Sequence, residues 1–113
     1  MDEPVALLQW ETVVGRLLDR TTLFPKSARF TFGARIDGRA LDILEALTEA
    51  RWASGPEKAN LLGSADRSIA VLLALLRLAH DRRLLDHASH ERLVRDIDEI
   101  GRMVGGWRRS IRP

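Results

Sequence analysis

The C-terminal segment carries the most regular apolar pattern of the chain. Its large apolar residues recur at alternating intervals of four and three: Leu93, Ile97, Ile100, Val104, Trp107 and Ile111. A repeat of about 3.5 residues is typical of helices that pack along one another in a bundle or coiled coil. The pattern therefore predicts a long helix here with one side buried against other helices.

Two glycines and a basic end share this segment. Gly101 and Gly105 lie four residues apart, so on a helix they share one face and permit close approach of another backbone. We therefore expect Gly101, Val104, Gly105 and Trp107 to contribute to packing between subunits, although the pattern also allows Trp107 to be a core residue. No acidic residue follows Glu99, whereas four arginines do: Arg102, Arg108, Arg109 and Arg112.

Apolar periodicity and turn residues predict three further helices. Phe24-Pro25 ends the first helix, and either Pro25 or Ser27 starts the second. Ser54-Gly55-Pro56 separates the second helix from the third. We expect helices over about 4–23, 27–53, 57–84 and 88–110, in one domain spanning 1–113. Their short connections predict an all-α, antiparallel up-down-up-down four-helix bundle.

The residue types present exclude several classes of site. The chain has no cysteine, which excludes disulfides, thiol catalysis and cysteine-based zinc sites. His80, His87 and His90 match no recognised metal-binding spacing, so we expect surface histidines near a helix junction. The sequence contains no phosphate-binding loop, nucleophile motif or Glu-x-x-His pair. We therefore expect no catalytic residue, no metal and no cofactor.

The sequence also lacks the pattern of a membrane or secreted protein. No apolar run approaches the roughly 20 residues that a membrane-spanning helix needs. Asp2 and Glu3 stand where a signal peptide would carry basic residues. We expect a soluble cytoplasmic protein.

Charge is distributed unevenly along the chain. The net charge is +2, but residues 1–56 carry one more acidic than basic side chain, and residues 57–113 carry three more basic than acidic. Most of these bases are arginines, which suit bidentate phosphate contacts. Two arginine clusters are candidate nucleic-acid contacts. The first is Arg77, Arg82 and Arg83, and the second is Arg102, Arg108 and Arg109. Antiparallel packing would place the two clusters at opposite ends of the bundle. Basic side chains at a helix C-terminus also complement the helix dipole. The alternative interpretation is therefore that these arginines are solvated surface charges without a nucleic-acid ligand.

Two stretches carry a family resemblance. The first is Phe-Pro-Lys-Ser-Ala-Arg-Phe-Thr-Phe-Gly-Ala-Arg-Ile at 24–36, and the second is Asp-Glu-Ile-Gly-Arg-Met-Val-Gly-Gly-Trp at 98–107. The first resembles a characteristic segment of the Avd family, the accessory variability determinants of diversity-generating retroelements, with Phe32 where that family more often has Leu. The second resembles the closing motif of the same family.

The resemblance implies a non-catalytic four-helix bundle that assembles into a homopentameric, positively charged barrel. It also implies binding to the reverse transcriptase of the retroelement and to RNA or DNA. Basic positions that recur in the two family motifs are Lys26, Arg29, Arg35 and Arg102, without individual roles. This chain is less basic than that family's barrel. The alternative is therefore an assembly module that binds only protein, akin to the bundles encoded by intervening sequences of ribosomal RNA genes.

Overall fold

The structure, a computed structural model, describes residues 3–111. Four long helices account for most of this range: α1 (Glu3–Thr22), α3 (Ala34–Trp52), α4 (Gly55–Asp81) and α5 (His87–Arg109). A short helix α2 (Lys26–Ala28) and a π-helical turn η1 (Arg29–Gly33) precede α3 without a break. No strand occurs in this range. Arg112 lies outside the described residues.

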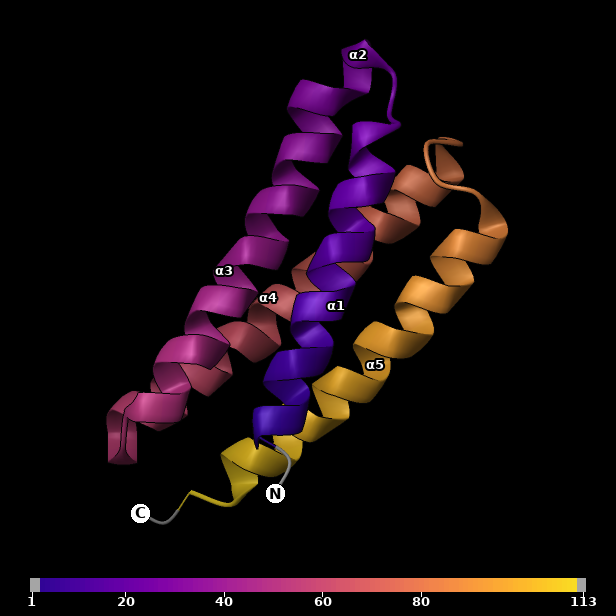
Figure 1. Cartoon of the computed structure of the whole chain (residues 1–113). Coiled ribbons are helices and arrows are strands. Elements are labelled where there is room, and N and C mark those ends of the chain that lie inside the picture. The colour runs from indigo at the N-terminus through magenta and orange to yellow at the C-terminus, as the bar shows by residue number, and fades with distance from the viewer. Residues whose placement is uncertain (1–2, 112–113) are drawn as a thin grey trace.

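Each long helix packs against two others. The contacts join α1 to α3 and α5, and α4 to α3 and α5. Figure 1 shows α2 and the turn between α4 and α5 at the upper end of the molecule, and the turn between α3 and α4 at the lower end. The bundle is 46 Å long and about half as wide. We use "upper end" and "lower end" in this sense below.

The predicted seam of α5 forms part of the core. Leu93, Ile97, Ile100, Val104 and Trp107 are all buried within the chain. In α1, Trp10 is fully buried, and its indole Nε1 donates a 3.0 Å hydrogen bond to the backbone oxygen of Ala40 in α3. Burial of each large apolar side chain contributes roughly 1.5–3 kcal/mol. The packing of this seam is therefore a main source of the fold's stability.

The second helix begins with an irregular segment. Pro25 precedes α2 and provides no side-chain cap, and the π-helical turn η1 follows. Gly33 ends that turn in a buried position, where an added Cβ would lie 3.7 Å from the Cβ of Thr21 in α1. The π-helical turn and the close approach of α1 therefore coincide at Gly33.

The turn between α4 and α5 has a defined geometry. Arg83 has a φ of 63°, in the left-handed region, and its N–H donates to the oxygen of His80 while the N–H of Leu84 donates to that of Ala79. This is the Schellman pattern that ends many helices, although glycine usually occupies the left-handed position. It ends α4 at Asp81, three residues before the predicted end. Asp86 then caps α5 by accepting a 3.0 Å hydrogen bond from the N–H of Ser89.

None of the helices between residues 3 and 111 combines the length and the apolar character that crossing a lipid bilayer requires.

Candidate nucleic-acid interface

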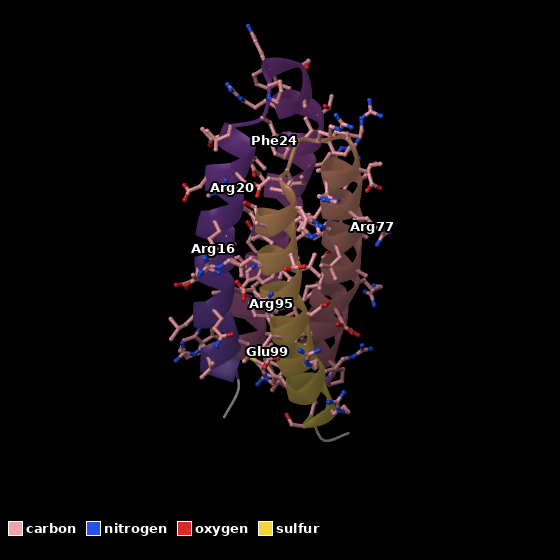
Figure 2. The ribbon with its side chains drawn as sticks, turned by 90° about the vertical axis from the view of Figure 1, so that its right-hand side faces the viewer. Arg16, Arg20, Phe24, Arg77, Arg95 and Glu99 are labelled. Atoms are coloured by element: carbon pink, nitrogen blue, oxygen red, sulfur yellow. The ribbon has the colours of Figure 1, made fainter. Side chains whose placement is uncertain are left out.

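The fold brings two separate basic groups of the sequence to its upper end. Lys26 and Arg29 lie at the start of the second helix, and Arg82 and Arg83 lie in the turn after α4. Figure 1 places α2 and that turn at the same end of the molecule. Arg77 is one turn further down α4, and Figure 2 shows it projecting from the outer side of that helix. We call Lys26, Arg77, Arg82 and Arg83 the upper basic zone.

Arg29 has a structural role at this end. Its guanidinium donates 3.3 Å hydrogen bonds to the backbone oxygens of Thr22 and Phe24. These oxygens lie at the end of α1 and in the turn after it, where the helix leaves its last carbonyls without partners. Arg29 therefore fixes the turn between α1 and α2, a role that its place in the sequence motif did not reveal.

The upper basic zone has charges available for a ligand. Among residues 3–111, no ion pair within 4.0 Å involves Lys26, Arg77, Arg82 or Arg83. All four residues are exposed. Exposed cations without a partner can contact phosphates without first breaking a protein ion pair.

At the lower end, most of the predicted basic residues are paired. The Nη2 atom of Arg102 lies 2.9 Å from Oε2 of Glu99, and the Nη1 atom of Arg108 lies 3.6 Å from Oδ2 of Asp66 in α4. Arg109 has no ion pair in the described range, and its guanidinium lies close to Gly105. The two predicted basic zones therefore differ, because in the described range all cations of the upper zone are unpaired, whereas two of the three in the lower zone are paired.

Arg35 lies in a mostly apolar groove. The groove has a volume of about 330 Å³ and is lined by Phe30, Thr31, Phe32, Arg35, Leu75 and Leu78. Phe30 is 73% exposed and Leu78 is 48% exposed. Apolar side chains of this size at the surface are typical of contacts with another macromolecule.

The three histidines gather at the junction of α4 and α5. The ring of His80 stacks on that of His90 at 4.6 Å between centroids and lies 5.4 Å from that of His87. No group of three potential ligands in the described part of the chain has the geometry of a metal site. His87 is mostly exposed, whereas the Nε2 atom of His90 is buried and lacks a hydrogen-bond partner.

Comparisons with known proteins identify the family. A family model described as bAvd-like matches residues 5–111, which include both sequence motifs. The chain belongs to the bAvd-like family. No curated protein matches it. Among solved structures, a protein of unknown function from the S23 ribosomal protein family of Bacteroides thetaiotaomicron has a TM-score of 0.88 at 17% identity, over 97% of this chain and 100% of that one. This second likeness concerns the fold alone.

Within this bAvd-like fold, two residues predicted for subunit packing belong to the core. Val104 is fully buried, and Trp107 is 4% exposed, with the ammonium group of Lys58 5.7 Å from the centre of its ring. They are not accessible to another subunit, because α5 turns its 3.5-residue seam inward. Gly101 and Gly105 instead line a shallow groove between α4 and α5, together with Arg102 and Arg109.

Arg83, whose backbone has a left-handed conformation, provides a test of the upper basic zone. A glycine at this position avoids the Cβ strain, so Arg83→Gly is expected to raise the free energy of unfolding by about 1 kcal/mol. It also removes a cation, so we expect weaker RNA binding. Urea denaturation and fluorescence anisotropy measure the two effects. Arg83→Lys is the control, which keeps the charge and the strain, so it is expected to leave stability unchanged and to weaken RNA binding less than Arg83→Gly does. Unchanged RNA affinity of Arg83→Gly would exclude Arg83 from the interface.

His90 predicts a pH-dependent stability. The pKa of His90 lies below 6.5, and burial is the main cause. The positive charges of His80, His87 and Arg77 lower this pKa further, whereas the negative charge of Asp81 raises it. The unfolded chain therefore binds this proton at a higher pH than the folded chain does. Stability is expected to fall as the pH drops through about 6.5, and to level off below the folded pKa. His90→Gln should flatten this part of the curve in thermal unfolding at several pH values, whereas His87→Gln at the exposed ring should change it less.

Proposed function

We propose that this chain is a non-enzymatic accessory protein of a diversity-generating retroelement. It acts in the cytoplasm as an antiparallel up-down-up-down bundle that assembles into a homopentamer. The assembly binds the reverse transcriptase together with template RNA or its complementary DNA, and so supports mutagenic copying of a target gene. The observation that carries this proposal is the bAvd-like match over residues 5–111.

The upper basic zone supports the nucleic-acid part of the proposal. Lys26, Arg77, Arg82 and Arg83 are exposed cations without ion pairs in the described range. A single chain offers few such charges, but a ring of identical chains repeats them at one end. Phosphate affinity and its salt dependence grow with the number of cations engaged. The zone lacks the amide side chains that read base edges, so binding should depend on phosphates and not on sequence.

Two measurements test the proposal. The first is copurification of the tagged chain with its cognate reverse transcriptase, at low salt. The second is fluorescence anisotropy with a labelled structured RNA titrated across salt concentrations. Binding that weakens steeply with salt is expected, because several phosphates are neutralised at once. Absence of both complexes at low salt would refute the proposal.

A second candidate function is an assembly module that binds protein only. The apolar groove lined by Phe30, Leu75 and Leu78 favours it, since such a surface suits a protein partner better than a phosphate backbone. This candidate predicts copurification with the reverse transcriptase but no RNA binding at any salt concentration. The two measurements above therefore separate the two functions.

A further inference from the structure

Several large apolar side chains are exposed on the outer sides of α1 and α3. Leu8 and Leu18 of α1 are 63% and 38% exposed, and Leu41 and Trp52 of α3 are 41% and 79% exposed. The two helices pack side by side, as Figure 1 shows, and the hydroxyl of Thr21 hydrogen-bonds to the carboxylate of Asp37 across them. We call these four residues the α1/α3 face. Exposed apolar side chains gathered in this way are typical of a surface that another protein covers.

Two glycines on the same helices have no explanation within the chain. Gly15 and Gly38 are exposed in the middle of α1 and α3, and an added Cβ at either would meet no atom within 4 Å. Glycine in a helix interior destabilises it relative to alanine. Gly15 is three residues from Leu18, and Gly38 is three residues from Leu41, so each lies on the apolar stripe. A glycine at such a position permits close approach of a second chain.

Two exposed acidic side chains lie on this face, together with the cation Arg51, whose guanidinium lies 5.2 Å from the centre of the Trp52 ring. Glu11 is four residues before Gly15, and Glu45 is four residues after Leu41, so both belong to the same stripes. Both are exposed, and neither has an ion pair in the described range. A covering partner should therefore present apolar and basic side chains.

A second face of the same chain presents exposed apolar and basic side chains. Val71 and Leu78 of α4 are 40% and 48% exposed, and Leu78 lines a groove together with Phe30 of η1 and Arg35 of α3. Arg67 is four residues before Val71, on the same stripe of α4. Neither Arg35 nor Arg67 has an ion pair among residues 3–111. We call Phe30, Arg35, Arg67, Val71 and Leu78 the α3/α4 face.

We propose that the α1/α3 face of one copy packs head to tail against the α3/α4 face of the next copy. Apolar stripes meet in this contact, and Glu11 and Glu45 approach Arg35 and Arg67. The two faces adjoin at α3, so successive copies turn around an axis, and a heterologous contact of this kind forms a ring when that rotation closes. The inference rests on the homo-oligomer of the proposed function and names the surfaces that build it.

Chemical cross-linking tests the pairing of the two faces. The chain has no cysteine, so single-cysteine variants have no background. A short bismaleimide reagent should join Leu41→Cys to Val71→Cys when the two proteins are mixed, and should join neither variant to itself. Arg95→Cys on the outer side of α5 is the matched control and should not be joined to Leu41→Cys (Figure 2). Self-linking of Leu41→Cys, or equal linking to Arg95→Cys, would overturn the proposal.

Light scattering of further variants tests the same contact independently of RNA. Trp52→Ala should raise the dissociation constant of the oligomer at least tenfold. Gly38→Ala should weaken assembly while raising the melting temperature of the dissociated chain by about 4 °C. Glu45→Arg and Arg67→Glu should each weaken assembly, and the double variant should recover it. An oligomer that none of these changes weakens would overturn the proposal.

The outcomes distinguish this inference from the proposed function. Loss of RNA binding and of the reverse transcriptase complex, with the cross-linking pattern intact, would refute the proposed function and leave the interface standing. An oligomer that binds RNA but fails the cross-linking pattern would refute the interface alone.

Discussion

Replacement of Arg77, Arg82 and Arg83 by glutamine is expected to weaken binding of structured RNA on the order of a hundredfold at moderate salt. The three side chains belong to the exposed upper basic zone and have no ion pair in the described part of the chain. Their positive charge is therefore free to act on phosphates. Each engaged cation that is lost should also lower the slope of log affinity against log salt by about one. Fluorescence anisotropy across a salt series measures both quantities.

The lower end offers a control with the same change in net charge. Replacement of Arg102, Arg108 and Arg109 by glutamine also removes three positive charges. Two of these arginines already pair with Glu99 and Asp66, so less of their charge is available to RNA. We expect a much smaller loss of affinity. Equal losses in both triple variants would mean that net charge, and not the upper basic zone, determines binding.

The sequence predicted which segments are helical and which side of α5 is buried. The apolar residues from Leu93 to Trp107 alternate between intervals of four and three, and such a period places them all on one side of a helix. The period does not say whether the buried side meets the same chain or another. For this reason Val104 and Trp107 were predicted at a subunit contact, whereas they lie in the core of one chain.

The end of α4 was harder to predict. Arginine rarely adopts the left-handed conformation that ends a helix, so nothing in the local sequence marked Arg83 as the terminating residue. The basic residues at 77, 82 and 83 were recognised as a cluster, but their meeting with Lys26 at one end depends on the path of the whole chain. Local patterns can identify such residues, and only the tertiary arrangement brings them together.

Trp10 and Trp52 differ in burial, and this difference gives the second large expected effect. Trp10→Ala is expected to lower the free energy of unfolding by about 3–5 kcal/mol. Trp10 is fully buried, and the change removes its packing and the hydrogen bond from Nε1 to the oxygen of Ala40. A domain of this size has a total stability of roughly 5–15 kcal/mol, so the loss is a large fraction. Urea denaturation measures it.

Trp52→Ala is the matched control, because the same side chain is removed from the surface. Trp52 is 79% exposed, and the guanidinium of Arg51 lies 5.2 Å from the centre of its ring. The expected change in the stability of a single chain is within about 0.5 kcal/mol. The comparison must be made at protein concentrations where the chain is dissociated, because assembly adds a concentration-dependent term to apparent stability. If Trp52→Ala then destabilised the chain as much as Trp10→Ala, Trp52 would belong to the fold, and the α1/α3 face would lose its largest apolar contact.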